Sequence, residues 1–330
     1  MPVLAADIGG THTRLCLAEK QAKQVHLIYE QVYASQQYPD FISIVKSFLS
    51  ETHLAHPDAA CFAVAGPVRA QQAQVTNLPW QLDAGQLKKE LAITTLSLIN
   101  DFQAVGYGLE VLNKDQLFSL QLGELEKQGR RALIGAGTGL GISHLLYQNH
   151  AYVPYSSEGG HAGFAPADDE QGRLLHYLQN SLDYVGYEHI LSGSGLQRLY
   201  QFFLDENGTD SEFTKDIFQA LDPAVEITRH AKDKDDLLAV QTLDCFIQIY
   251  GAQAGNVALN YLPTGGLYIA GGIAPKIIEL LNSERFITAF HHKGVMTELM
   301  QSFPVKVIME DKVGLLGAVV FACRQGHPPY

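Results

Sequence analysis

A strand that breaks into a glycine-rich turn and then resumes as a second strand occurs twice in this 330-residue chain. The first copy spans residues 3–18 and turns at Gly9-Gly10, and the second begins near Ala132 and turns at Gly135–Gly141. Local identity between the two copies is low, so the repeat is one of pattern. Two similar domains that face each other would bring both glycine turns to one cleft.

The order of the predicted elements in the first 110 residues indicates a layered α/β domain. Apolar residues at helical spacing predict a helix over Phe41–Leu49, and an apolar helical stretch is expected after Asp101. The strands are expected at Val3–Ile8, Thr13–Glu19, Val25–Tyr33, Cys61–Ala65 and Thr95–Ile99.

The rest of the chain predicts a larger second domain. The segment 168–261 is expected to be mainly helical, with its longest helix from about Asp235 to Asn260. A late apolar helix over residues 313–322 carries small residues against which another helix could pack closely. We therefore expect a small α/β domain built from residues 1–110 and 303–325, and a large α/β domain built from residues 111–302.

The composition is that of a globular protein with room for two cores, because 46% of the residues are hydrophobic. The 23 basic and 35 acidic residues give a net charge of −12, which opposes binding to nucleic acid or to anionic membranes. No run approaches the roughly 20 apolar residues that span a bilayer, and the N-terminus lacks the features of a signal peptide. An anionic substrate would therefore have to be held locally, by backbone amides, a few cations and a metal ion.

The four cysteines are scattered along the sequence, at positions 16, 61, 245 and 323, and none forms a CxxC pair. This spacing predicts neither a zinc knuckle nor a disulfide framework. A reducing cytoplasm is the compartment that such cysteine usage fits best.

The first glycine turn has the composition of a phosphate-binding hairpin. Its residues, Asp7 to Thr11, offer backbone N–H groups and a hydroxyl to phosphate oxygens, and they place a carboxylate where it could hold a metal-bound water. The alternative is an ordinary hairpin turn that uses Gly9-Gly10 only for positive φ angles.

The second turn, Gly135–Gly141, is not a Walker A loop, because no Gly-Lys-Ser or Gly-Lys-Thr follows it. It is not a GxGxxG motif either, because Leu140 stands where the third glycine of that motif belongs. Its four glycines and its threonine suit a loop that wraps a phosphate, and a tight hairpin is the alternative. A later pair, Gly271-Gly272, follows a buried strand and would let an adenine ring lie against the backbone. Close packing of a helix on that strand explains the pair equally well.

Polar residues at predicted element ends are the candidates for acceptor chemistry. Asn100-Asp101 stands where a strand gives way to a helix, so Asp101 could take a proton from a substrate hydroxyl that Asn100 orients. Asp is also a common helix N-cap, which is the alternative for Asp101. Glu158 and His161 could bind vicinal sugar hydroxyls. The alternatives are a surface loop with incidental charge and a metal site, although a zinc site would need a third ligand. Glu188, taken alone, would be an acidic residue at a helix start.

Taken together, these residues resemble the bacterial glucokinase family within the hexokinase, sugar kinase and actin-like ATPase superfamily, nearly end to end. Asp7 to Thr11 looks like the family's first phosphate motif, and Gly135–Gly141 looks like its second. Residues 269–273 resemble the adenosine motif, and residues 313–322 the late helix that connects the domains. The sugar site of the family is matched by Asn100, Asp101, Glu158, His161 and Glu188. The resemblance implies two actin-like ATPase (ribonuclease H-like) domains with a central cleft.

One departure separates the chain from the related ROK branch of repressors and kinases. Where that branch carries a cysteine-rich zinc motif, this chain has Asp168-Asp169-Glu170-Gln171. Because the phosphate strand begins at residue 3, no DNA-binding helix-turn-helix is expected before it. The chain is therefore expected to group with the zinc-free glucokinases rather than with the repressors.

The resemblance implies a cytoplasmic, homodimeric enzyme that uses ATP and Mg²⁺ to phosphorylate the 6-hydroxyl of D-glucose at the start of glycolysis. Asp101 would be the general base, Asp7 would position Mg²⁺ through water, and the domains would close to exclude water. The other sugar hydroxyls would be held by Asn100, Glu158, His161 and Glu188. The nucleotide would be bound by Ala6, Asp7, Ile8, Gly9, Gly10, Thr11, Gly137, Thr138, Gly271 and Gly272.

The sequence leaves other substrates and functions open. Within the same class, the acceptor could be mannose, fructose or an N-acetylated hexosamine, and the donor could be polyphosphate. From a different class, the chain could be a non-catalytic sugar sensor or an actin-like nucleotide-binding protein. A carboxylate at position 101 together with a full set of hydroxyl-binding residues argues against both.

Overall fold

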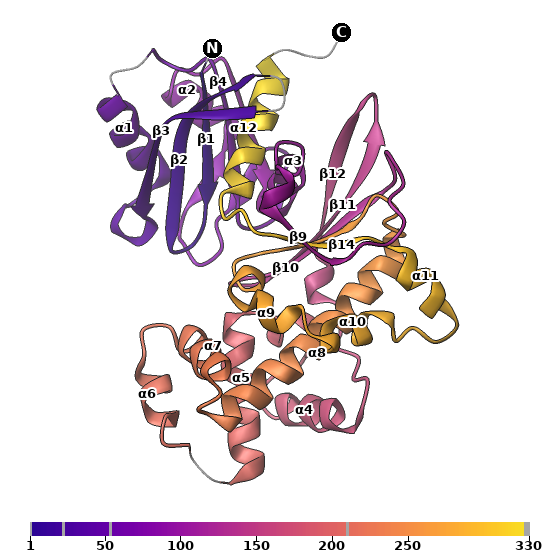
Figure 1. Ribbon diagram of the computed structural model, residues 1–330. Helices are drawn as coiled ribbons and strands as arrows, with labels where there is room; N and C mark the ends of the chain where they lie inside the picture. Colours follow the sequence, from indigo (N-terminus) through magenta and orange to yellow (C-terminus); the bar gives the residue numbers. More distant parts are fainter. Residues whose placement is uncertain (1, 22–23, 53–54, 209–210, 327–330) are drawn as a thin grey trace. The chain divides into compact units, whose positions relative to one another are not determined.

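The computed structural model describes residues 2–21, 24–52, 55–208 and 211–326, which form two compact units. Unit 1 takes its described residues from 1–116, 148–156 and 310–330, and unit 2 takes its own from 117–147 and 157–309. Figure 1 shows the elements of both units, which are described separately below.

Unit 1 is built on a five-stranded sheet with the order β3-β2-β1-β4-β8. The first three strands of the chain pair antiparallel, whereas β1, β4 and β8 run parallel. The strands are β1 (Val3–Ile8), β2 (His12–Gln21), β3 (Gln24–Ala34), β4 (Ala59–Val64) and β8 (Thr95–Asn100). The predicted strands are therefore confirmed, and the carboxyl ends of β1 and β8 place Asp7 and Asn100 at the same edge of the sheet.

Alternation along β1 assigns each face of this sheet to its own helices. Leu4, Ala6 and Ile8 are buried in a core with α1 (Phe41–Thr52) and α2 (Ala84–Glu90). Val3 and Ala5 point to the other face, which is covered by α3 (Asp101–Gly108) and α12 (Val313–Gly326). Asp7 has the parity of Val3 and Ala5, so its carboxylate lies on the α12 side.

Helices α3 and α12 lie side by side in the view of Figure 1, and glycines let them approach closely. A Cβ atom on Gly317 of α12 would overlap the carbonyl oxygen of Ala104, and one on Gly108 of α3 would overlap that of Val313. The prediction that small residues in 313–322 serve close helix packing is confirmed. Because α3 begins at Asp101, this packing also fixes the start of that helix.

A small antiparallel sheet follows β4 in unit 1, with the order β5-β6-β7. Its strands are β5 (Val68–Arg69), β6 (Gln72–Gln74) and β7 (Gln81–Asp83). The sequence analysis did not predict these strands, because runs of two or three residues carry no measurable period.

The second sheet has the order β12-β11-β10-β13-β14-β9. Its first five strands repeat the order and directions of the first sheet, with antiparallel β10 and β11 followed by parallel β13 and β14. The strands are β9 (Leu117–Gln121), β10 (Arg131–Ala136), β11 (Leu140–Gln148), β12 (Ala151–Ser157), β13 (Leu267–Ala270) and β14 (Val305–Ile308). The repeat seen in the sequence is thus a repeat of topology. The predicted domain division placed residues 303–325 in the small domain, whereas β14 pairs with β13 and β9 in unit 2.

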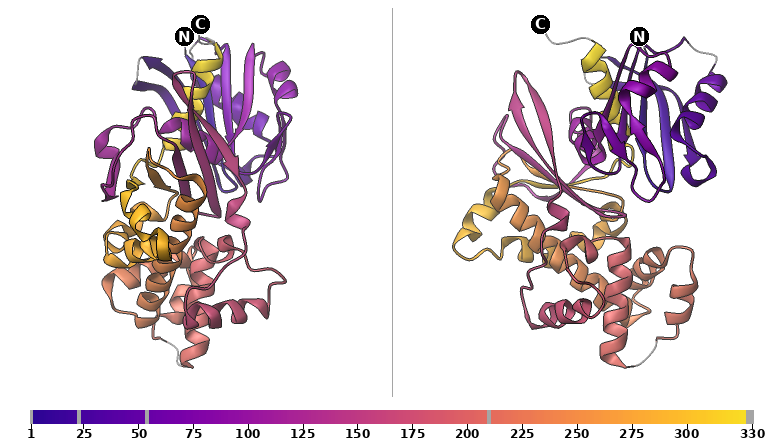
Figure 2. Two further views of the ribbon diagram at one scale, coloured as in Figure 1. Left: turned by 90° about the vertical axis from the view of Figure 1, so that its right-hand side faces the viewer. Right: turned by 180° about the vertical axis from the view of Figure 1, so that it is seen from behind.

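The helices of unit 2 pack on one face of its strands, as both views of Figure 2 show. The central helix, α8, is buried along most of its length, contacts α5, α7 and α10, and confirms the long helix predicted near 235–260. The helices are α4 (Asp169–Gln179), α5 (Gly193–Asn207), α6 (Thr214–Gln219), α7 (Pro223–Asp233), α8 (Leu237–Tyr261), α9 (Ile278–Leu281), α10 (Glu284–His291) and α11 (Thr297–Ser302). Short 3₁₀ turns complete the chain: η1 (Ser35–Gln37), η2 (Lys114–Gln116), η3 (Gly159–His161), η4 (Tyr187–His189), η5 (Ala274–Ile277) and η6 (Gly294–Met296). In the part of the chain that the structure describes, none of the helices has the length and apolar character needed to cross a bilayer.

Candidate active site

Asp7 lies at the end of β1, opposite Arg14 of β2. Burial raises the pKa of the Asp7 carboxyl above its ordinary value, and the neighbouring Arg14 guanidinium opposes this shift. Its Oδ2 atom also faces the first turn of α12, where a Cβ on Gly314 would lie 3.3 Å away. The sheet thus presents one carboxylate, close to a cation and a helix N-terminus, beside the first glycine turn.

The first turn uses its glycines for packing rather than for unusual dihedral angles. Neither Gly9 nor Gly10 has a φ in the left-handed region, so the hypothesis of a hairpin that needs positive φ is wrong. A Cβ on Gly9 would lie 3.1 Å from the carbonyl oxygen of His12, and one on Gly10 would lie 2.9 Å from that of Thr76. Both distances are shorter than ordinary carbon–oxygen contacts, so a larger residue at either position would require the neighbouring backbone to shift.

Asn100 is the N-cap of α3, and every polar position of its amide has a partner. Its Oδ1 accepts from the backbone N–H groups of Phe102 and Gln103, at 3.0 and 3.2 Å. Its Nδ2 donates to the Gly66 carbonyl at 3.1 Å and to Asp101 Oδ1 at 2.9 Å. An amide has two donor hydrogens and two lone pairs on oxygen, so Asn100 makes its full complement of hydrogen bonds within the protein.

Asp101 is the first residue of α3, and the capping role considered for it belongs to Asn100 instead. Its Oδ1 is held by the Asn100 amide and by the backbone N–H of Phe102, both at 2.9 Å. The side chain is half-buried at the carboxyl end of the parallel strand β8. In open α/β sheets this is the usual position of groups that act on a ligand.

Within unit 2, the structure brings His161 and Glu188 together. The loop after η3 pairs with η4, because the Tyr187 N–H donates to the Ala162 carbonyl at 3.0 Å. The His161 Nδ1 atom then lies 3.8 Å from Glu188 Oε1. Glu158 precedes η3, and both Glu158 and His161 are exposed, whereas Glu188 is half-buried. Two acceptors and an imidazole from neighbouring turns suit the binding of hydroxyl groups.

The second glycine turn is shorter than predicted, because Gly135 and Gly141 pair with each other inside β10 and β11. The turn proper is residues 137–139, and Thr138 at its tip is exposed. Two neighbours hold this turn: the Gly193 N–H at the start of α5 donates to the Gly137 carbonyl at 2.9 Å, and the Leu140 N–H donates to Glu188 Oε2 at 2.8 Å.

The glycines of unit 2 separate into those required by packing and those that face open space. Gly271 has a φ of +83°, and a Cβ there would overlap the Ala136 carbonyl, so close packing explains this residue. Gly272 would place a Cβ in open space, and Gly137 would place one with only the Gly272 backbone nitrogen nearby, at 4.0 Å. Side chains at these two positions would meet open space, so packing within the protein does not explain these two glycines.

The similarities of the chain to known proteins agree with this arrangement. The sequence profile described as Glucokinase matches residues 4–325. The glucokinases of Trichormus variabilis and Nostoc sp. are 43% and 44% identical to the chain, with 98% of this chain and 99% of each relative covered. A crystal structure of a glucokinase from an Antarctic psychrotroph superposes with a TM-score of 0.84 at 32% identity, covering 98% of this chain and 99% of that one.

The chain belongs to the glucokinase family. The predicted fold class, two actin-like ATPase domains, is confirmed by this membership and by the structural similarity. The predicted site residues of this glucokinase family member lie at strand ends, turns and helix starts in each unit, where ligand-binding groups of α/β proteins are found.

The described residues of this family member contain no group of three or more His, Cys, Asp and Glu side chains that could hold a metal ion. The single carboxylate of Asp7 is enough for Mg²⁺, because this ion retains several waters and binds through one or two carboxylates together with substrate phosphates. The donor set therefore suits a metal that arrives with a nucleotide rather than a resident metal centre.

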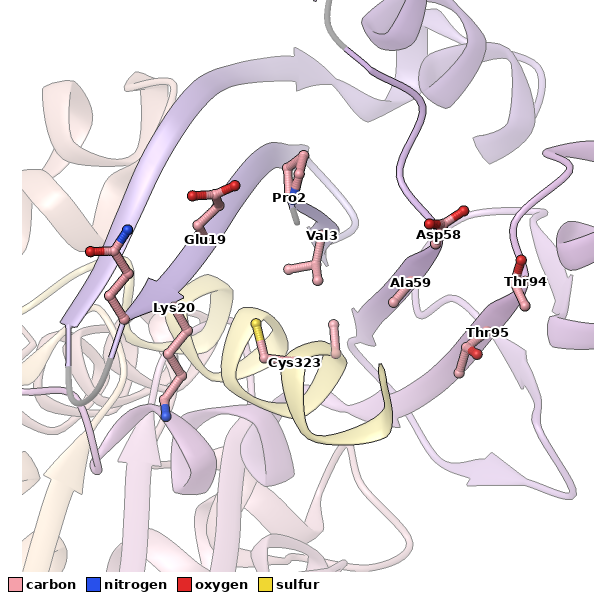
Figure 3. Close-up of a pocket in the computed structure, with 11 residues that line it drawn as sticks. Pro2, Val3, Glu19, Lys20, Asp58, Ala59, Thr94, Thr95 and Cys323 are labelled. Atoms are coloured by element: carbon pink, nitrogen blue, oxygen red, sulfur yellow. The ribbon is translucent and has the colours of Figure 1, made fainter. Parts of the chain in front are cut away.

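A pocket of about 380 Å³ lies elsewhere in unit 1 (Figure 3). It is lined by the first residues of three parallel strands, Val3, Ala59 and Thr95, together with Glu19 of β2 and Cys323 of α12. Each of these strands is six residues long, so the pocket lies about 17 Å from the edge that carries Asp7 and Asn100. The pocket is therefore separate from the candidate active site.

Three features of the site were missed in the sequence. The start of α5 touches the second turn through Gly193, and Ser192, whose Oγ accepts from the Gly195 N–H, was available as an N-cap signal. Arg14 beside Asp7 could have been found from the alternation of β2. The hydrogen bond between Leu140 and Glu188 joins residues 48 positions apart, and no local pattern signals it.

Proposed function

We propose that this member of the glucokinase family transfers the γ-phosphoryl group of ATP to the 6-hydroxyl of D-glucose, with Asp101 as the general base. Glucokinase activity, the first step of glycolysis, follows from the family to which nearly the whole chain belongs. The observation that carries the catalytic assignment is the position of Asp101, whose Oδ1 is fixed by two donors at the carboxyl end of β8.

The acceptor sugar is proposed to be bound by the hydroxyl-binding set predicted from the sequence. Glu158, His161 and Glu188 offer carboxylate oxygens and an imidazole on two paired turns. Asn100 contributes chiefly by holding Asp101, since a direct contact with a sugar hydroxyl would exchange one of its present hydrogen bonds. Several hydrogen bonds at fixed angles would orient one hydroxyl toward the base, which is how positioning lowers the barrier.

The donor, MgATP, is proposed to bind through backbone amides. The protein carries a net charge of −12, so an anionic ligand has to be held by local groups. The open space at Gly137 and Gly272 supports an approach of the nucleotide to the second turn and the start of α5. Thr138 and Gly271 flank these positions. In unit 1, the turn from Ala6 to Thr11 offers further amides and a hydroxyl, and Asp7 is proposed to hold Mg²⁺ through water.

In the proposed reaction, the Asp101 carboxylate accepts the proton of the 6-hydroxyl as that oxygen attacks the γ-phosphorus atom in line. The bond to the bridging oxygen of ADP breaks, and the products are ADP and glucose 6-phosphate. No covalent enzyme intermediate is required, because positioning and electrostatic stabilisation carry most of phosphoryl transfer.

The test is a titration with glucose in the presence of ATP and Mg²⁺, following glucose 6-phosphate, with mannose, fructose and polyphosphate as alternative substrates. D101A should lose at least about 10²-fold in kcat, the usual contribution of a general base, while glucose binding stays measurable by calorimetry. A wild-type protein that binds glucose but does not phosphorylate it would instead favour a sugar sensor.

We also propose a cytoplasmic homodimer. Exposed apolar side chains of unit 2, including Leu122 and Val295 at 81% and 94% exposure, support a contact with a second copy. The Glu124 N–H donates to the Ser302 carbonyl, so the segment after β9 contacts the end of α11. The four cysteines are all unpaired thiols, which supports a reducing compartment. Sedimentation of the purified chain tests the dimer.

A further inference from the structure

The carboxylate of Glu188 has contacts in two directions. Its Oε2 accepts the backbone N–H of Leu140, at the end of the second glycine turn, at 2.8 Å. Its Oε1 lies 3.8 Å from His161 Nδ1, on the side of the proposed sugar ligands. One side chain therefore touches both a residue proposed for the acceptor and the turn proposed for the donor.

Gly139, the last residue of the turn proper, is shaped by this carboxylate. A Cβ at Gly139 would overlap Glu188 Oε2 and lie 3.0 Å from Cδ, and its three nearest neighbours are all atoms of Glu188. The φ of Gly139 lies outside the left-handed region, so its backbone conformation is open to alanine. A Cβ at this position would therefore have to displace the end of the Glu188 side chain from its place beside the turn.

The segment around η4 holds the turn at further points. The Gly193 N–H donates to the Gly137 carbonyl, and Ser192 Oγ donates to the carbonyl of Glu188 at 2.8 Å. On the opposite side, Gly160 of η3 packs so closely against the Leu140 carbonyl that a Cβ would overlap it. The Gly137 end of the turn is therefore held by the start of α5, and the Leu140 end is held by η3 and η4, the short turns that carry His161 and Glu188.

We infer that Glu188 is a positioning residue for the nucleotide phosphates as well as a sugar ligand, and that Gly139 is glycine to leave space for its carboxylate. This inference rests on the proposed function, in which the second turn binds the donor. With Oε2 on the turn, a sugar that contacts Oε1 fixes the same carboxylate and so orders the donor site. Glucose and nucleotide then strengthen each other's binding, and by linkage the effect is reciprocal.

The experiment measures the affinity for MgADP by calorimetry in the absence of any sugar. If Glu188 served only to bind sugar, its replacement would leave this affinity unchanged. E188A should weaken MgADP binding about tenfold, as expected for the loss of one hydrogen bond to a charged group. E158A, which removes another carboxylate of the proposed sugar set, should leave MgADP affinity within twofold while it weakens glucose binding. Unchanged MgADP affinity in E188A would overturn the inference.

A double-mutant cycle tests the role of Gly139 directly. G139A should weaken MgADP binding about tenfold when Glu188 is present, and by less than twofold in the E188A background, where the added methyl group has space. Equal losses in both backgrounds would show that Gly139 serves direct contact with the ligand, which would overturn this part of the inference. A failure of the proposed function is distinguishable, since the wild type would then bind MgADP but form no glucose 6-phosphate.

Discussion

Replacing Gly317 of α12 by alanine should destabilise the protein, although alanine has the higher helix propensity. A Cβ on Gly317 would overlap the Ala104 carbonyl oxygen and lie 2.7 Å from the Ala104 carbonyl carbon and the Gly108 nitrogen. These are backbone atoms of α3, so no side-chain rotation can relieve the overlap. The G317A variant must therefore move α3 away from α12.

The magnitude follows from two opposing effects. Overpacking costs about 3 kcal/mol when backbone has to shift, and the exchange of glycine for alanine in a helix returns about 1 kcal/mol. We expect a net loss of about 2 kcal/mol, or roughly 4–8 °C in Tm for a unit of this size. Because α3 begins at Asp101, a displacement of about 1 Å should also lower kcat by up to about 10²-fold.

The matched control is G172A on α4, where a Cβ would meet no atom within 4 Å. This variant should gain about 1 kcal/mol from helix propensity and keep its kcat. Urea and thermal unfolding report stability, and a coupled assay for glucose 6-phosphate reports kcat. A G317A protein with wild-type stability and wild-type kcat would refute the argument that this contact fixes Asp101.

Three further predictions concern half-buried polar groups. Burial raises the pKa of Asp7 in the folded state, so this carboxyl favours folding at pH values below its pKa in the unfolded chain. This contribution to stability is lost as the pH rises through the pKa of the folded state. D7N should therefore be more stable than the wild type near neutral pH but not in acid, while losing Mg²⁺-dependent turnover; urea unfolding at several pH values checks this. N100A should cost about 1 kcal/mol of stability as a lost cap and lower kcat because Asp101 loses a donor, and wild-type kcat would contradict it. The Lys293 ammonium, whose pKa burial lowers, donates to Asn256 Oδ1 at 2.8 Å, and the Asn256 amide donates to the tyrosine hydroxyl of η4 at 3.2 Å. K293M should raise the KM for glucose about threefold to tenfold with kcat nearly unchanged, K293R should restore it, and a KM that stays at the wild-type value would disprove the link.

The strand-and-turn pattern could be predicted from the sequence because it depends on neighbouring residues only. Alternation and glycine content located β1, β2, β10 and β11, and their antiparallel pairing follows from the short turns that join them. The same reasoning placed Asn100 and Asp101 at the junction of β8 and α3. It could not decide which of them caps the helix, because Asn and Asp are equally good N-caps and the choice depends on where the strand ends.

The reasons for individual glycines were not readable from the sequence. Gly9-Gly10 and Gly271-Gly272 have the same composition, yet only Gly271 among them adopts a left-handed φ. A side chain at Gly10 would push against the backbone of Thr76, and one at Gly139 would displace the carboxylate of Glu188. Such constraints depend on segments far away along the chain and appear only when the tertiary packing is known.

The two strand–turn–strand copies have the same topology but different freedom at their turns. In unit 1, the backbones of His12 and Thr76 occupy the space beside the two glycines. In unit 2, open space remains at Gly137, and the end of the turn contacts both the backbone of Gly160 and the carboxylate of Glu188, which is 48 residues from Leu140. A ligand therefore finds space beside Gly137 of the second turn, whereas the protein's own backbone fills the corresponding space at the first turn. Coupling between sugar and nucleotide is accordingly expected at the second turn, through Glu188.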